Sequence, residues 1–213
     1  MSTQMEFTYQ YIKERILTGI FKPSQKLTEI ELAQQVGVSR NTIKKAFLKL
    51  EQENLIAIEK NKGATIKAFT LEEILNYMEI REVLEVLISK SAYKNISSSD
   101  LDQMHGILGQ MKMLLANNDF KEYSEINKHF HAIIYASASN RQAVDMIMMI
   151  RTQLLRYQLR TILVPGRTDA SFKEHTQIYE AFRQKDEKLV AEAVINHVAN
   201  VRKAIEQNYQ LLI

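Results

Sequence analysis

The stretch that decides the fold is Leu27–Leu50, LTEIELAQQVGVSRNTIKKAFLKL. Apolar side chains recur at helical spacing in its first part, which predicts a short helix over residues 29–36 that faces a core. These side chains are Ile30, Leu32, Ala33 and Val36. Gly37 is expected to end this helix, because glycine tolerates a left-handed backbone. Ser39 is a favourable N-cap for a second helix, which we predict from Arg40 to about Asn54.

The predicted second helix has one apolar face and one basic face. Its apolar stripe consists of Ile43, Ala46, Phe47 and Leu50. Four cations and no acid lie between Ser39 and Leu50. Cationic side chains neutralise DNA phosphates, and Arg and Asn also pair with base edges. An ordinary amphipathic surface helix shares this pattern, but the order of short helix, glycine turn and Ser-capped helix is typical of a helix-turn-helix.

The flanking segments complete a winged domain. We predict a helix over residues 7–17, which Gly19 and Pro23 are expected to end. Apolar runs at 55–58 and 64–66 flank a basic turn, which predicts a β-hairpin; after a helix-turn-helix, such a hairpin is a wing that contacts the minor groove or phosphates. A solvated polar turn is the alternative for its tip, Lys60 to Gly63. The predicted DNA contacts are Thr28, Ser39, Arg40, Asn41, Thr42, Lys44, Lys45, Lys49, Asn61, Lys62 and Gly63.

The composition of the 213 residues is that of a globular protein, with 46% hydrophobic and 25% charged residues. The absence of cysteine excludes disulfides and thiolate metal sites. The N-terminus lacks an apolar signal core, and no run approaches the ~20 apolar residues of a membrane span. We therefore expect a cytoplasmic protein with no membrane partner.

The charge is unevenly distributed along the chain, although the net charge is only +3. Residues 1–68 hold 11 Lys and Arg against 7 Asp and Glu, whereas residues 69–213 hold 17 against 18. A small basic domain joined to a larger, nearly neutral domain is typical of a protein that binds DNA with the first domain and senses a ligand with the second. We therefore predict a DNA-binding domain over 1–68 and a ligand-binding and dimerisation domain over 69–213.

The second predicted domain is almost entirely helical. Its helical segments are separated by short connections at 95–97, 117–118 and 164–168, with Pro165, Gly166 and Asp169 breaking the chain. Helices joined in this way form an antiparallel bundle. The predicted fold is therefore mainly α: an N-terminal winged helix-turn-helix with a small β-hairpin, and a C-terminal bundle of six or seven helices.

Three of the five histidines, His131, His175 and His197, lie on separate predicted helices with apolar neighbours. Asn127 is four residues before His131 and shares its helix face. Three imidazoles brought to one cavity suit Zn, Ni or a similar divalent ion. Lone histidines on helices are more often ordinary core or surface residues, and that reading is preferred for His105 and His129.

Residues 7–67 resemble the winged helix-turn-helix of the GntR family of bacterial transcription regulators. The chain departs from the family pattern at Ser24, where glycine is usual, at Thr42, near a usual proline, and at Lys44, a usual arginine. Lysine lacks the bidentate geometry of arginine, so the operator sequence cannot be transferred from relatives. The matching residues are Ile16, Gly19, Pro23, Leu27, Thr28, Leu32, Ala33, Val38, Ser39, Arg40, Ala46, Leu50, Leu55, Asn61, Lys62 and Gly63.

Residues 71–208 are similar to the helical FCD sensor domain of the FadR-like GntR subfamily. The matching residues are Ile80, Arg81, Leu84, Glu85, Asn127, Phe130, His131, Asn140, Glu174, His175 and His197. The resemblance implies a divalent metal, Zn or Ni first, held by Asn127, His131, His175 and His197. Asn127 replaces the usual aspartate, so one ligand brings no charge and metal occupancy is expected to be weaker.

The resemblance also implies a small carboxylate beside the metal, and a cation is needed to complete its pocket. Arg81, Arg156 and Arg160 are the candidates, because a guanidinium matches a carboxylate. We expect a ligand-responsive repressor that binds a near-palindromic operator as a homodimer. The alternatives are a metal-dependent enzyme, which lacks a carboxylate base within the histidine cluster, and a nucleoid-type protein, which the modest net charge disfavours.

Overall fold

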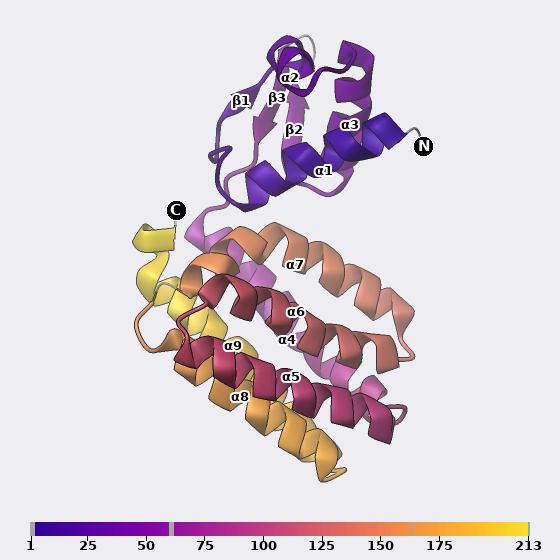
Figure 1. Cartoon of the computed structure of the whole chain (residues 1–213), viewed down its shortest axis with the longest axis vertical. Coiled ribbons are helices and arrows are strands. Elements are labelled where there is room, and N and C mark those ends of the chain that lie inside the picture. The colour runs from indigo at the N-terminus through magenta and orange to yellow at the C-terminus, as the bar shows by residue number, and fades with distance from the viewer. Residues whose placement is uncertain (1–2, 60–61, 163, 213) are drawn as a thin grey trace. The chain divides into compact units, whose positions relative to one another are not determined.

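The computed structural model describes residues 3–59, 62–162 and 164–212, apart from the side chains at 156, 158 and 159. The chain forms two compact units (Figure 1). The first consists mainly of the residues up to Thr70, and the second consists of Leu71–Ile150 with Tyr157–Leu212. No helix within the described ranges combines the length and the apolar character that crossing a bilayer requires.

The first unit is the predicted winged helix-turn-helix. It contains α1 (Thr3–Leu17), β1 (Lys26–Leu27), α2 (Glu29–Val36), α3 (Arg40–Gln52), β2 (Ile56–Glu59) and β3 (Gly63–Ile66). The strands form an antiparallel sheet in the order β1-β3-β2, with Leu27 opposite Ala64 and Ile56 opposite Ile66. Its core contains Ile12, Ile43 and Leu50 together with Ile56, all fully buried.

Both helices of the motif begin with a capping side chain, of which Ser39 was predicted and Thr28 was not. Oγ1 of Thr28 accepts a hydrogen bond from the amide of Glu31 at the start of α2, and Oγ of Ser39 accepts from the amide of Thr42 at the start of α3. Gly37 ends α2 in the left-handed conformation, with φ of 74°. These local features set the angle at which α3 leaves the turn.

Several predicted details of this unit were wrong. Helix α1 begins at Thr3 rather than near residue 7, and α3 ends at Gln52. The sheet has a third strand, β1, which the sequence analysis did not predict. Ile30 was expected to face the core but is 52% exposed, because it lies on the side of α2 opposite the buried Leu32.

The second unit is a bundle of six helices within the described residues. They are α4 (Leu71–Tyr93), α5 (Ser98–Ala116), α6 (Phe120–Ser137), α7 (Arg141–Thr161), α8 (Arg167–Arg183) and α9 (Glu187–Leu212). Helix α4 packs against α9 and α6, and α5 packs against α6 and α8 (Figure 1). Its core includes Met104, Phe130, Ile147 and Val190.

Helix α8 begins at Arg167, within residues 164–168, which were predicted to be a connection between helices. Gly166 takes a left-handed conformation, with φ of 75°, and passes directly into the helix. The glycine and proline that were interpreted as breaks in the helix therefore lie just outside it. This earlier start places Arg167 inside the first turn, where it becomes part of the site described next.

Candidate functional site

The three predicted histidines meet in the interior of the helical unit. His131 lies on α6, His175 on α8 and His197 on α9, and all three are buried. One ring nitrogen from each lies within 4.8 Å of the others. The Nε2 atoms of His131 and His175 are 3.1 Å apart. The distances between these nitrogens suit ligands that share one metal ion.

Backbone and carboxylate partners fix the tautomers of two of these rings. Nδ1 of His175 lies 2.6 Å from the carbonyl oxygen of Ser171, which can only accept a hydrogen bond, so Nδ1 carries the proton. Nδ1 of His197 lies 2.8 Å from Oε2 of Glu174 and donates to it in the same way. With Nδ1 protonated, Nε2 is the nitrogen of each ring that can present a lone pair to a metal when the ring is neutral.

Burial also keeps His175 in the neutral form that binds metals. Its pKa falls to about 3, first because burial disfavours the charged imidazolium and second because His197 lies beside it. The ring is therefore neutral at physiological pH, so binding a cation requires no removal of a charge from His175. The site is consequently ready to bind a divalent cation near neutral pH.

Glu174 joins the histidine cluster to a buried network that the sequence analysis missed. Both of its oxygens accept from the guanidinium of Arg167, at 3.1 and 2.8 Å, and Oε1 also accepts from Nδ2 of Asn200 at 3.0 Å. Glu174 was among the residues that match the FCD pattern, but no role was predicted for it. Its partners come from two helices, and the start of α8 had been predicted too late.

Asn127 supplies a further donor atom suited to a metal. It lies one helical turn before His131 on α6, and its Oδ1 is buried without a hydrogen-bond partner among the described residues. A buried carbonyl oxygen of this kind is costly unless it is satisfied. Three neutral imidazoles and one amide oxygen match the preferences of borderline divalent ions such as Zn and Ni. The residues present therefore fit the metal that the family resemblance implies.

The predicted effector arginines differ in where they lie. Arg81 is buried on α4, and its Nε donates to Oε1 of Glu85 at 3.2 Å. The same oxygen accepts from the hydroxyl of Tyr135 at 2.7 Å, and the Tyr135 ring stacks against His131. Arg81 is thus linked to the histidine cluster through two side chains.

Arg160 contacts the far end of the bundle. Its Nη1 donates to the carbonyl oxygen of Leu212 at 3.1 Å, close to the end of α9. This bond holds the last turn of α9 and does not itself reach the histidines. The side chain of Arg156, the third predicted arginine, lies outside the described part of the chain.

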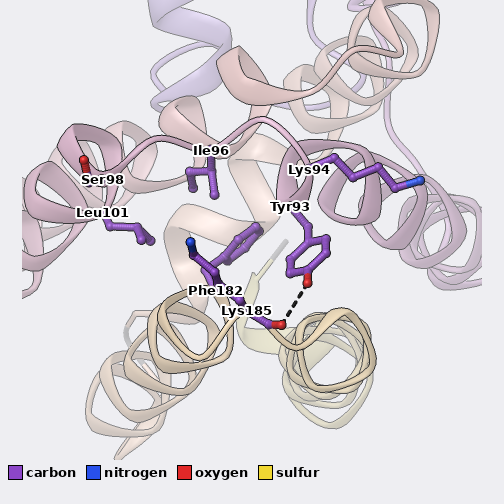
Figure 2. A pocket seen from close by; sticks show the side chains of 7 residues that line it. All are labelled: Tyr93, Lys94, Ile96, Ser98, Leu101, Phe182 and Lys185. Carbon is purple, nitrogen blue, oxygen red and sulfur yellow. Dashed lines mark hydrogen bonds between the residues drawn. The ribbon is translucent and has the colours of Figure 1, made fainter.

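A second cavity, of about 330 Å³, lies apart from the histidine cluster, at the turn between α8 and α9. Its lining consists of Tyr93, Lys94, Ile96, Ser98, Leu101, Phe182 and Lys185. Figure 2 shows the ammonium of Lys185 reaching across Phe182, while that of Lys94 points away. The hydroxyl of Tyr93 donates to the carbonyl oxygen of Lys185 at 2.8 Å and closes one side. None of the residues predicted to bind a metal or effector lines it.

In the winged unit, α3 presents an exposed polar face. Arg40, Asn41, Lys44 and Lys45 are exposed on it, while its apolar stripe is buried. Ser39 and Thr42 begin the helix, and their hydroxyls lie 2.9 Å apart. Cationic and amide side chains on one accessible helix face are the groups that contact phosphates and base edges.

Three other predicted DNA contacts have structural roles in the first unit. Thr28 caps α2, and its hydroxyl also donates to Glu31. Lys49 pairs with Glu6 at 2.9 Å and lies over the ring of Tyr9, so it stabilises the packing of α3 against α1. A Cβ at Gly63 would lie 2.3 Å from the carbonyl oxygen of Leu27, so this position requires glycine.

The wing tip is described only in part. Lys62 is exposed, and its amide donates to the carbonyl oxygen of Glu59 at 3.0 Å. Asn61 and the neighbouring Lys60 lie outside the described residues. Glu29 and Glu59 line a groove of about 420 Å³ beside Arg40 and Lys44. The groove therefore combines two carboxylates with two cations, whereas Asn41 and Lys45 do not line it.

A winged helix-turn-helix with an exposed basic recognition helix, joined to a helical unit with a buried imidazole cluster, defines a two-part DNA-binding regulator. Residues 4–66 match the model of the "Bacterial regulatory proteins, gntR family", and residues 76–200 match the FCD domain. The chain therefore belongs to the GntR family and carries an FCD domain. It is a DNA-binding transcription regulator and not an enzyme.

Characterised relatives share most of their length with this chain. The HTH-type transcriptional repressor RspR of Escherichia coli K12 is 22% identical over 199 residues, which cover 93% of this chain and 87% of RspR. The Uxu operon regulator of Haemophilus influenzae is 26% identical, with 91% and 78% covered. The galactonate operon transcriptional repressor of E. coli is 22% identical, with 91% and 93% covered.

Solved structures share the fold. The structure of E. coli McbR/YncC has a TM-score of 0.82 and 18% identity, and the match covers 98% of this chain and all of that one. A second structure, of the Listeria monocytogenes regulator Lar, has a TM-score of 0.68 and 20% identity, with 97% and 98% covered. At such identities the likeness concerns the fold alone.

Proposed function

We propose that this regulator is a repressor that leaves its operator when a small carboxylate metabolite binds beside a divalent metal in the helical unit. The observation that carries this proposal is the buried cluster of three imidazoles, of which two present Nε2 lone pairs. A cluster of this kind is costly to bury unless it serves a ligand. The repressors among its relatives support the direction of control.

The metal would be held by His131, His175 and His197, with Oδ1 of Asn127 as a fourth donor. When bound, the ion would supply a positive charge and open coordination positions for a carboxylate. Of the two predicted arginines whose side chains are described, Arg81 is the one linked to this region, through Glu85 and Tyr135, so we propose that it balances the charge of the effector. Because all four donors are neutral, the net charge of the loaded site is +2, which favours an anionic ligand.

For DNA binding, we propose a homodimer that places one α3 helix in each half of a near-palindromic operator. Two-fold symmetry of the protein matches two-fold symmetry of the DNA and fixes the spacing of the half-sites. The effector changes operator affinity only if it binds one arrangement of the dimer better than the other. The coupling is therefore reciprocal, and operator DNA should weaken effector binding by the same factor.

The proposal is tested by elemental analysis of the purified protein, combined with mass spectrometry of any small acid that co-purifies. We expect about one divalent ion per chain, and its loss in His131→Ala and His175→Ala. His129→Ala is the matched control, because His129 is an exposed histidine on the same helix as His131. Retained metal in both cluster variants, with helical circular dichroism unchanged, would show that these residues are not the ligands.

A further inference from the structure

The cavity beside the turn between α8 and α9 combines apolar walls with an accessible cation (Figure 2). Its apolar walls are the side chains of Tyr93, Ile96, Leu101 and Phe182, which come from the end of α4, the following connection, α5 and α8. The volume of about 330 Å³ lies at the lower end of the range for small-molecule pockets. A concave apolar surface with one charged group is the usual form of such a pocket, so only a compact ligand would fit here.

The cation of this cavity is Lys185, which directly follows the last turn of α8. Figure 2 shows its ammonium reaching across Phe182 toward Leu101, whereas the ammonium of Lys94 points away from the cavity. Lys185 is exposed and forms no ion pair with the described residues, although the nearby Arg183 pairs with a glutamate at 2.7 Å. A solvent-accessible ammonium at an apolar wall is therefore available to an anion.

The acidic side chains around this cavity have other partners. Among the described residues none lines it. Asp186, which follows Lys185, accepts hydrogen bonds from two amides at the start of α9. Asp100 accepts from the amide and the hydroxyl of Ser97 in the capping box of α5. The protein thus provides no carboxylate for Lys185, and the lining is positive or neutral throughout.

We propose that this cavity is a second small-molecule site, which binds a compact aromatic monocarboxylate. The carboxylate would pair with the ammonium of Lys185, and the aromatic ring would pack against Phe182 and Tyr93. One carboxylate is sufficient because only one ammonium reaches the cavity. The histidines and arginines predicted to bind a metal or effector do not line it, so this inference does not depend on the proposed function.

Phenylacetate is the probe for this site, and methyl NMR of the full-length protein, labelled at isoleucine and leucine, reports where it binds. A chelator is present throughout, so that no metal-bound acid contributes. We expect saturable shifts of the methyl signals of Ile96 and Leu101, with a dissociation constant of about 1 mM or below. Ile96→Val and Leu101→Met assign the two signals. If neither signal shifts saturably, the inference is wrong.

Charge variants test the role of Lys185. Lys185→Gln should weaken phenylacetate binding about fivefold, because the carboxylate loses its partner. Lys94→Gln is the matched control, since Lys94 lines the same cavity with its ammonium pointing away, and it should have a smaller effect. Phenylacetamide, which has the same ring without the charge, should bind the wild type as weakly as phenylacetate binds Lys185→Gln. Equal affinities of both variants for phenylacetate would contradict the pairing with Lys185.

A variant that fills the cavity tests its location. Ser98 lines the cavity and is exposed, so Ser98→Trp can place a large ring there without disturbing the core, and it should abolish phenylacetate binding. His175→Ala should bind phenylacetate like the wild type, with thermal melts confirming the fold of both variants. Binding that survives in Ser98→Trp but is lost in His175→Ala would place the acid at the histidine cluster and overturn the inference. Displacement of phenylacetate by an equal concentration of inorganic phosphate would show that any anion binds, which contradicts selection of an aromatic acid.

Discussion

Glu174 fixes the orientation of the His197 ring in the histidine cluster. Its carboxylate accepts from Nδ1 of His197 and is held in turn by Arg167 and Asn200. A carboxylate behind a ligating histidine fixes the ring orientation and makes the other nitrogen a better ligand. We therefore propose that the strength of metal binding here would depend on Glu174, although Glu174 is not one of the proposed ligands.

Replacing Glu174 by Gln should lower Zn²⁺ affinity about tenfold, because the amide keeps an acceptor for His197 but loses the negative charge. Competition with a chromophoric chelator measures this affinity. Glu180→Gln is the matched control, since Glu180 is on the same helix and forms an exposed pair with Arg183. An affinity unchanged by Glu174→Gln would show that the carboxylate has no role in metal binding.

The burial of His175 predicts acid sensitivity of the metal-free protein. Its pKa is about 3 in the folded state, whereas an unfolded imidazole has a pKa of about 6.5. The unfolded chain therefore takes up a proton first, so this contribution to stability is complete above pH 6.5 and is lost as the pH falls toward 3. Urea midpoints at pH 7.5 and 5 should differ less in His175→Gln than in wild type. Equal pH dependence in both would contradict this role for His175.

For single residues, the sequence predicts which histidines form the cluster but not which side chains fix their orientation. His131, His175 and His197 could be chosen because each lies on its own amphipathic helix, and the structure brings them together. Glu174 and Arg167 could not, because their roles depend on the packing of α8 against α9. Ile30 shows the converse error, since its spacing to Ala33 fits one helix face, but the buried Leu32 lies on the opposite side of α2.

Among the elements, α3 carries the contacts expected for DNA. Asn41 and Lys45 lie on its exposed face, away from the groove lined by Glu29 and Glu59. Lys45→Ala should weaken binding of a duplex selected from a random pool by about tenfold and reduce the salt dependence, because it removes a phosphate contact. Fluorescence anisotropy at several salt concentrations measures both. A salt slope identical to that of wild type would mean that Lys45 does not contact phosphate.

Lys49 lies on the same helix as Lys45, but we expect its replacement to affect stability more than DNA affinity. Its ammonium pairs with Glu6 and lies over Tyr9, so Lys49→Ala should lower the unfolding free energy by about 1 kcal/mol. DNA affinity should change less than in Lys45→Ala. Thermal melts and anisotropy on the same samples separate the two effects. A large loss of DNA affinity without a loss of unfolding free energy would instead show that Lys49 contacts DNA.

The elements were predicted best where local chemistry fixes them. Gly37 was predicted to end α2 and Ser39 to begin α3, and the structure confirms both. Strand β1 was missed because two residues show no periodicity, and it forms only by pairing with β3. The start of α8 was placed too late because Gly166 was interpreted as a break, although it leads directly into the helix.

In the whole molecule, one chain combines a DNA-binding unit with a unit built around buried imidazoles. The basic excess lies in the first 68 residues, so DNA attraction is concentrated in one unit. In the proposed dimer, control from the second unit would require a ligand whose affinity differs between two arrangements of that dimer. A tenfold change in operator affinity needs a difference of about 1.4 kcal/mol, well within what one buried charge-assisted contact supplies.

The most direct test of this account is the dissociation constant of the Zn²⁺-loaded dimer for its selected duplex, with and without the carboxylate that co-purifies. The account predicts preference for that duplex over random competitor and at least a tenfold rise in the constant when the acid is added. The rise should be absent in His175→Ala. No preference for any duplex, or a constant that the bound acid leaves unchanged, would contradict it.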